Sequence, residues 1–370
     1  MLEREILHSL SADQFAFTPL RHGECSNALL SIRLNCIEML ENGYSHVNLL
    51  AVDYTKAFDK LPHKSIIKAL REEMNVHPSS VRFIESFLTD RRQRVLSSNG
   101  RPSNFVSVTS GVPQGSILGP ILFAIVLNSF RVKNNASRVI AYADDISVLC
   151  PEHNGLHSNV YQEVDNLVTW STSRGLVINT TKTVCLPLSR RHVSTVPTIM
   201  IDGHQIQIVQ STKILGIILD ANMKWNSHVN HLMSKCSKSM YIVRNLCKHG
   251  CSDDIVVSAF KAFVLCHLTY AWSVLCDVTV AQMSRMLSFE KTLKRLCTSK
   301  IDFSTKECLI NINKRLIKKI VKNYPNHRIS NFFVSRPNSS YLLRNSLTIL
   351  PKFSYSSLSR NSFLKFYKFS

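Results

Sequence analysis

Two adjacent acidic residues lie between two apolar runs, and this pattern restricts the fold more than any other feature of the chain. Residues 139–142 read Val-Ile-Ala-Tyr, Asp144 and Asp145 follow after one alanine, and residues 146–149 read Ile-Ser-Val-Leu. Short apolar runs on both sides of a polar turn predict a β-hairpin. Neighbouring carboxylates in an apolar setting repel each other, and a bound cation relieves this repulsion. The pattern indicates a cation-binding hairpin or, as the alternative, an ordinary polar turn.

A third acid follows another apolar run. Residues 48–53 read Asn-Leu-Leu-Ala-Val-Asp, which predicts a buried strand with Asp53 at its tip. Nucleotidyl transfer needs two divalent ions about 3.5–4 Å apart, held by carboxylates from rigid elements that converge. Mg²⁺ prefers such oxygen ligands and retains substrate phosphates and water. Asp53, Asp144 and Asp145 have the required chemistry, although Asp53 alone also fits a helix cap.

Positive charge is concentrated in the second part of the chain. The 370 residues have a formal net charge of +20. Residues 1–223 hold 21 Lys and Arg against 19 Asp and Glu, whereas residues 224–370 hold 24 against 6. This distribution predicts a catalytic module joined to a module that binds a polyanion, nucleic acid above all. A solubilising excess of charge is the alternative.

The remaining patterns predict a soluble protein of a reducing compartment with several helices. The eleven cysteines include no C-x-x-C pair, and Cys247, His249 and Cys251 match no common zinc finger. No apolar stretch reaches the roughly 20 residues of a membrane span. We expect helices over residues 1–42 with a break near Thr18-Pro19, over 64–73 and 80–88, from the loop 111–115 through Asn128, and over 160–173, 228–246, 254–275 and 281–297. Two strands are expected around residues 98–100, and a β segment over 213–219.

Three segments resemble the catalytic motifs of reverse transcriptases. Residues 52–59 (VDYTKAFD) look like the first motif, residues 111–120 (GVPQGSILGP) like the second, and residues 141–145 (AYADD) like the Tyr-x-Asp-Asp box. Their order and spacing also agree. Weaker likenesses lie at Gln14-Phe15-Ala16-Phe17 and in residues 175–183. Residues 86–95 and the basic helices after Trp225 are similar to the polymerases of non-LTR (LINE-type) retrotransposons.

The resemblance implies an α+β, right-hand polymerase fold with fingers, a palm of antiparallel strands and helices, and a helical thumb. We expect the fingers and palm in residues 1–223, the basic thumb in 224–300, and a basic C-terminal region of uncertain order in 301–370. The implied activity is that of an RNA-directed DNA polymerase, a nucleotidyltransferase that transfers nucleotides from dNTPs to a primer 3′-hydroxyl.

The resemblance also implies catalytic and metal-binding roles. Asp53 and Asp144 would bind two Mg²⁺ ions, with Mn²⁺ as an alternative, and Asp145 would assist as a ligand or from the second shell. The backbone at Tyr54 would add an oxygen. Leu215 and Gly216 would belong to the primer grip.

Five further residues are expected around the nucleotide. Phe58 would lie under the sugar and exclude a 2′-hydroxyl, and Gln114 would contact the nucleotide from a loop in which Gly115 permits close approach. Lys182 would contact a phosphate or protonate the departing pyrophosphate, and Arg21 would grip the triphosphate. A buried helix aromatic is the alternative for Phe58, and a surface lysine is the alternative for Lys182.

The expected partners follow from the same resemblance. They are an RNA template, a DNA primer and their hybrid, with dNTP substrates and no membrane. A basic thumb would hold phosphates without reading sequence, so binding should weaken with salt. Action inside the cell, in the nucleus, is implied by the family alone.

Three departures from the family pattern leave a second function open. Ala16-Phe17-Thr18 replaces the usual Gly-Phe-Arg, Asn128-Ser129 replaces Asn-Asp, and the chain begins close to the fingers motif. We therefore expect an N-terminally truncated piece of a longer protein. The alternative function is a catalytically inactive nucleic-acid-binding remnant of the same fold; a splicing-type maturase fits less well.

Overall fold

The computed structural model describes most of the chain. These residues are 6, 10–18, 24–74, 76–153, 155–190, 193, 196–275, 277–299, 301–335 and 349–351. The chain forms two compact units, each assembled from separate stretches of sequence. The first unit comprises residues 1–24, 45–187 and 193–208, and the second comprises residues 25–44, 188–192 and 209–370.

A five-stranded sheet forms the centre of the first unit. Its order is β4 (Arg138–Tyr142), β5 (Asp145–Glu152), β1 (His46–Val52), β6 (Val184–Leu188) and β9 (Gln207–Ile208). β4, β5 and β1 pair in antiparallel fashion, whereas the β6–β9 pair is parallel. Six of the seven residues of β1 are buried, as expected for a central strand covered on both faces.

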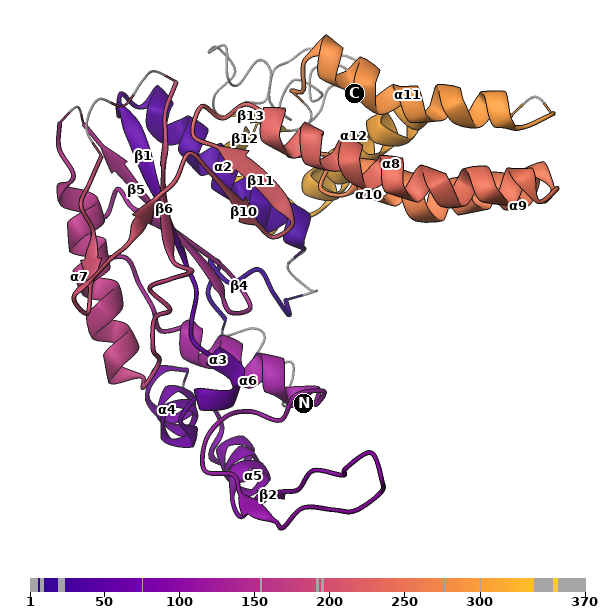
Figure 1. Cartoon of the computed structure of the whole chain (residues 1–370). Coiled ribbons are helices and arrows are strands. Elements are labelled where there is room, and N and C mark those ends of the chain that lie inside the picture. Colours follow the sequence, from indigo (N-terminus) through magenta and orange to yellow (C-terminus); the bar gives the residue numbers. More distant parts are fainter. Residues whose placement is uncertain are drawn as a thin grey trace. The chain divides into compact units, whose positions relative to one another are not determined.

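Of the helices of the first unit, one lies beside the sheet and the others lie beyond one end of it (Figure 1). They are α3 (Ala57–Lys60), α4 (His63–Lys68), which continues as a π-helical turn over Ala69–Glu73, α5 (Pro78–Leu88), α6 (Leu118–Leu127) and α7 (Ser158–Ser173). Two short strand pairs complete the unit, β2 (Arg92–Gln93) with β3 (Val106–Ser107) and β7 (Met200–Ile201) with β8 (His204–Gln205). α6 is apolar along its whole length, and eight of its ten residues are buried.

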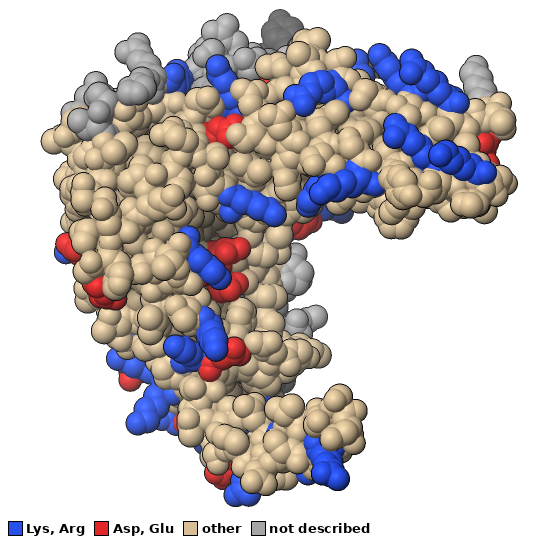
Figure 2. All heavy atoms as spheres, viewed as in Figure 1, with Lys and Arg blue, Asp and Glu red and all other residues tan. Residues whose placement is uncertain are grey.

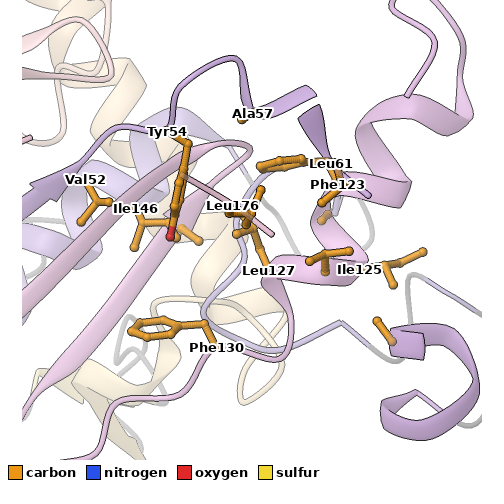
Figure 3. Packing of buried hydrophobic residues seen from close by; sticks show 14 of the residues in the cluster. Val52, Tyr54, Ala57, Leu61, Phe123, Ile125, Leu127, Phe130, Ile146 and Leu176 are labelled. Atoms are coloured by element: carbon orange, nitrogen blue, oxygen red, sulfur yellow. The ribbon is translucent and has the colours of Figure 1, made fainter. Parts of the chain in front are cut away.

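The core of the first unit lies between the sheet and α6. Tyr54, Phe123, Leu127, Phe130 and Ile146 belong to one buried cluster, and Figure 3 shows their side chains side by side. Tyr54 is only 6% exposed, and its hydroxyl shares a 3.0 Å hydrogen bond with Ser171 Oγ of α7. Burial of the ring raises the pKa of Tyr54. The core therefore fixes the segment that follows β1, immediately beside Asp53.

The second unit is mainly helical. It contains α2 (Cys25–Glu41), the hairpin β10 (Ser211–Ile214) and β11 (Ile217–Asp220), α8 (Asn226–Lys248), α9 (Asp253–Phe260), the π turn Lys261–Leu265, α10 (Cys266–Thr269), α11 (Val280–Leu296) and α12 (Thr305–Lys322). A short 3-10 helix, Ser330–Phe332, precedes the pair β12 (Phe333–Ser335) and β13 (Ile349–Pro351). α8 packs against α9 and α11, and α12 contacts α10 and α11. α12 buries one apolar face with Leu309, Leu316, Ile317 and Ile320.

A buried ion pair connects distant parts of the second unit. Arg33, in the middle of α2, is 3% exposed and donates to Asp277 and to the carbonyl of Val274. Its guanidinium lies 4.9 Å from the ring centroid of Trp225, and Trp225 Nε1 donates to Asp277 Oδ1 at 2.6 Å. One carboxylate therefore satisfies two buried donors that lie 192 residues apart in the chain.

Most expected elements are confirmed, and two helix predictions are wrong in part. Residues 10–18 are not helical, because this stretch hydrogen-bonds alongside β4. The expected β segment 213–219 is confirmed as a hairpin whose turn is Leu215-Gly216, both with positive φ. The expected helix 254–275 ends at Thr269, since Ala271 has a φ of 48°. Among the described residues, no helix is long and apolar enough to cross a membrane.

The buried ion pair yields a stability prediction. Asp277→Ala should lower the free energy of unfolding of the second unit by about 3–5 kcal/mol, because it leaves the Arg33 charge buried without a partner. The matched control is Lys294→Ala, which removes the exposed partner of an i,i+4 pair with Glu290 and should cost less than about 1 kcal/mol. Urea denaturation followed by circular dichroism measures both, and equal losses would contradict the assignment.

Candidate active site

The pairing of β1 with β5 brings the three predicted acids together. In this ladder Val52 lies opposite Ile146, so Asp53, the next residue after β1, lies at the same end of the sheet as Asp145. Tyr142 of β4 pairs with Asp145 of β5, which leaves Ala143 and Asp144 as a two-residue turn. Ala143 has a φ of 56°, in the left-handed region that tight hairpin turns require. The predicted hairpin is therefore confirmed, with the acids at its tip.

Asp145 experiences the charges of both other acids. Burial, and after it the Asp144 and Asp53 carboxylates, together raise the pKa of Asp145 to about 6. Carboxylates repel one another in this way when their negative charges are not neutralised. Magnesium sites in proteins commonly use one or two carboxylates together with substrate phosphates. The donor set therefore fits divalent cations that are bound together with a phosphorylated substrate.

Among the described residues, no group of three or more His, Cys, Asp or Glu side chains is arranged to hold a metal ion. The same observation applies to Cys247, His249 and Cys251, which are described residues.

The backbone of Asp53 is fixed by the segment before β6. Its N–H donates to Thr183 Oγ1 at 3.2 Å, and its carbonyl accepts from the N–H of Asn179 at 2.8 Å. Lys182 belongs to the same segment, and its Nζ lies 3.9 Å from Asp53 Oδ2. Lys182 is largely exposed, so this contact is weak and leaves the ammonium available to an anionic substrate.

Phe58 lies on the segment that follows Asp53, and the loop 111–115 bonds to that segment, because Val112 N–H donates to the carbonyl of Phe58 at 2.8 Å. The Phe58 ring stacks on Phe123 of α6, with centroids 4.6 Å apart and an interplanar angle of 29°. Phe58 remains half-buried rather than fully enclosed. Gly115 has a φ of 83°, and nothing lies within 4 Å of the position where a Cβ would stand. The backbone at Gly115 is therefore open to close approach, as expected from the sequence.

Two residues without an expected role hold this loop. Asp59 Oδ1 accepts a hydrogen bond from Gln114 Nε2 at 2.9 Å, and His63 Nε2 lies 2.8 Å from the carbonyl of Gly111. Gly111 itself lies directly against Asp59, because a Cβ there would stand 2.5 Å from the Asp59 carbonyl oxygen. In the sequence, only their position shortly after Phe58 pointed to Asp59 and His63. Their contacts with residues 111–114 join parts of the chain that are far apart in the sequence, so local patterns could not predict them.

Gln14 supports the hairpin turn. Its side chain is 2% exposed, and Gln14 Oε1 accepts from the N–H groups of Ala16 at 2.9 Å and of Ala143 at 3.3 Å. The backbone beside it bonds to β4, because Phe15 N–H donates to the carbonyl of Ala141. Gln14 thus contacts the residue immediately before Asp144, which its place in the sequence did not indicate.

Three further residues were expected at the site, namely Arg21, Leu215 and Gly216. Arg21 lies outside the described residues. Leu215 and Gly216 belong to the second unit, where they form the β10–β11 turn. The carbonyl of Leu215 accepts from the Tyr270 hydroxyl at 2.6 Å, and the Tyr270 ring would lie 3.2 Å from a Cβ at Gly216. The primer-grip role of these two residues stays a prediction.

The comparisons with known proteins identify the family. The sequence model of the family described as "Reverse transcriptase (RNA-dependent DNA polymerase)" matches residues 1–219, more than half of the chain. The chain therefore belongs to the reverse transcriptase family. This confirms the expected α+β polymerase fold, and the relatives below confirm the non-LTR retrotransposon type.

Among the relatives are proteins of insect mobile elements. The chain is 24% identical over 309 residues to the RNA-directed DNA polymerase from mobile element jockey of Drosophila melanogaster, covering 79% of this chain and 32% of the relative. It is 29% identical over 191 residues to the putative 115 kDa protein in type-1 retrotransposable element R1DM of Drosophila melanogaster, covering 50% of this chain and 18% of that protein. The chain thus spans about a third of the length of the first relative.

A solved structure is also similar. Apo telomerase from Candida tropicalis aligns with a TM-score of 0.45 and 10% sequence identity, covering 89% of this chain and 54% of that chain.

The raised pKa of Asp145 yields a prediction about stability and pH. An acid whose pKa is higher in the folded than in the unfolded state favours folding when protonated, so its ionisation destabilises the fold as pH rises through about 6. Asp145→Asn should therefore melt at a higher temperature than the wild type above pH 7, and the difference should vanish below about pH 4. Thermal unfolding without divalent ions, between pH 4 and 8, measures this.

The matched control for that measurement is Asp165→Asn, which changes an exposed acid of α7. It should leave the melting temperature nearly unchanged across the same pH range. A destabilised Asp145→Asn variant above pH 7 would contradict the repulsion among the three acids.

Proposed function

We propose that this chain carries the active site of an RNA-directed DNA polymerase of a non-LTR retrotransposon. The observation that supports this best is the convergence of Asp53, Asp144 and Asp145 at one end of the central sheet. Phe58 lies five residues after Asp53, and Gln114 lies on the loop 111–115 that bonds to the same segment. The reaction would transfer a nucleotidyl group from a dNTP to a primer 3′-hydroxyl opposite an RNA template.

The acids would hold two Mg²⁺ ions, for which Mn²⁺ could substitute. Bound ions would polarise the α-phosphate and neutralise the charge on the attacking and leaving oxygens. Asp53 and Asp144 are the proposed ligands of both ions, with Asp145 and the backbone oxygen at Tyr54 assisting. The mutual repulsion of the acids supports a cation there, because a cation would remove it.

The remaining groups would position the nucleotide. Gln114 would contact it from a loop that Asp59 and His63 hold in place, and the open backbone at Gly115 would permit its approach. Lys182 would move from Asp53 to a phosphate or donate a proton to the departing pyrophosphate. Arg21 would contact the triphosphate.

Basic helices of the second unit would bind the primer–template hybrid. Figure 2 shows Lys and Arg side chains gathered over these helices with few acids among them, in agreement with 24 basic against 6 acidic residues after residue 223. We propose that residues 224–300 act as the thumb, residues 1–223 as fingers and palm with the primer grip at Leu215 and Gly216, and residues 301–370 as a basic extension. Action in the nucleus follows from the family and belongs to the same proposal.

Primer extension tests the activity directly. With an RNA template, a DNA primer, dNTPs and Mg²⁺, the wild type should extend the primer, and Asp144→Ala/Asp145→Ala should be slower by about a thousandfold or more because the ions lose their ligands. Asp165→Ala should extend like the wild type. If the wild type binds hybrid tightly in a salt-sensitive way without extending it, the chain is the inactive nucleic-acid-binding remnant.

Phe58 generates a second prediction. Because its ring is fixed against Phe123, an aromatic under the sugar should collide with a 2′-hydroxyl, and Phe58→Ala should raise ribonucleotide relative to deoxyribonucleotide incorporation by about tenfold or more. Single-nucleotide incorporation with rNTPs and dNTPs measures the ratio. Phe83→Ala, which truncates an exposed ring of α5, is the control. Unchanged sugar selectivity in Phe58→Ala would refute the role.

A further inference from the structure

A hairpin arm extends from the first unit beside the loop that carries Gln114. Residues 91–108 form this arm, which begins with the β2–β3 pair, continues through a bridge between Leu96 and Pro102, and turns at Gly100. Val108 N–H donates to the carbonyl of Arg91 at 2.9 Å and closes the base of the arm. Figure 1 shows the arm running out beyond α5, away from the rest of the unit.

The charge of the arm has one sign. Residues 91–108 contain four arginines, Arg91, Arg92, Arg94 and Arg101, and no lysine or acid. None of the four forms an ion pair with any residue that the structure describes. Unpaired arginines on an exposed hairpin favour an anionic ligand, and their planar guanidinium groups suit phosphates in particular.

The same arm exposes apolar side chains among its arginines. Phe105 is 59% exposed, and Leu96 and Val106 are also exposed. The Arg94 guanidinium lies 4.8 Å from the centroid of the Phe105 ring, a stacked cation–π contact. Aromatic rings next to arginines bind single-stranded nucleic acid, because bases stack on the rings while the guanidinium groups neutralise the backbone.

A cleft connects the arm with the proposed nucleotide site. It has a volume of about 540 Å³ and is lined by Arg91, Arg92, Gln93 and Val108 at the base of the arm, by residues 110–114, and by Asp59. Gln114, whose amide is tied to Asp59, forms one wall. Arg91 is held in place, since its guanidinium stacks 5.1 Å from the Phe87 ring, whereas Arg92 is exposed. A strand in this cleft would pass directly beside Gln114.

We propose that the arm of residues 91–108 and the cleft at its base bind the single-stranded RNA template ahead of the incoming nucleotide. This inference rests on the proposed function, because a template strand is unpaired only before it is copied. Arg92 and Arg94 contact backbone phosphates, and Phe105 provides a stacking surface for a base. The arm distinguishes unpaired template from finished hybrid by this stacking, which a paired base does not offer.

Fluorescence anisotropy with RNA–DNA hybrids tests the proposal. Two labelled hybrids share one duplex, and only one has an eight-nucleotide 5′ overhang on the RNA strand. The wild-type chain should bind the overhang hybrid about tenfold more tightly than the blunt one. Arg92→Gln/Arg94→Gln and, separately, Phe105→Ser should lose most of this preference while keeping their affinity for the blunt hybrid.

Salt dependence adds a second readout. For the overhang hybrid, the slope of log affinity against log salt concentration should decrease in magnitude by about 1.4 in the double arginine variant, about 0.7 for each lost phosphate contact. Phe105→Ser should leave the slope unchanged because it removes no charge. Lys64→Gln/Arg82→Gln, which removes two exposed charges of α4 and α5 outside the arm and the cleft, is the matched control and should retain the overhang preference.

Each other outcome overturns the proposal. A wild type without overhang preference, arm variants that bind both hybrids like the wild type, or a control that loses the preference equally would exclude a template site on the arm. Unaltered binding by the arm variants would instead assign the exposed apolar surface to a protein partner. The assay contains no dNTP, so failure of primer extension with intact overhang preference would reject the polymerase function alone.

Discussion

The antiparallel pairing of β1 with β5 is the constraint on which the site depends. Seven residues of each strand are paired in register, and β1 is buried on both faces. A shift by one residue would turn every buried side chain of β1 to the opposite face, so the register is strongly specified. The same register places Asp53 beside Asp145, because both lie just beyond the Val52–Ile146 pair that ends the ladder. The packing of the apolar core thereby determines where the carboxylates of Asp53 and Asp145 lie.

The price of this arrangement is electrostatic. Three carboxylates at one end of a sheet repel each other, and burial together with this repulsion raises the pKa of Asp145. Hydrogen bonds hold the acids in place despite this repulsion. Asn179 and Thr183 fix the backbone of Asp53, Gln14 fixes the turn before Asp144, and Tyr54 anchors the chain in the core. Rigid support of this kind is what a site needs in order to hold ligands in one geometry.

The loop 111–115 shows the same division between support and function. Gly111 and Gln114 are held by His63 and Asp59, whereas Gly115 is left open. The cleft beside this loop continues into the arginine-rich arm. Gln114, proposed to contact the nucleotide, and Arg92, proposed to contact the template strand, therefore line the same cleft. Such continuity follows from folding residues 59, 91–93 and 110–114 into one neighbourhood.

The order of apolar and acidic residues was sufficient to predict the β1 strand, the β4–β5 hairpin and the three acids, because short apolar runs and turn chemistry are local properties of the sequence. The family was likewise visible in residues 52–59, 111–120 and 141–145. Only the tertiary structure decided that α2 joins the second unit, that residues 10–18 pair with β4 rather than form a helix, and that Gln14, Asp59 and His63 support the site. These are contacts between residues far apart in the chain, and local propensity carries no information about them.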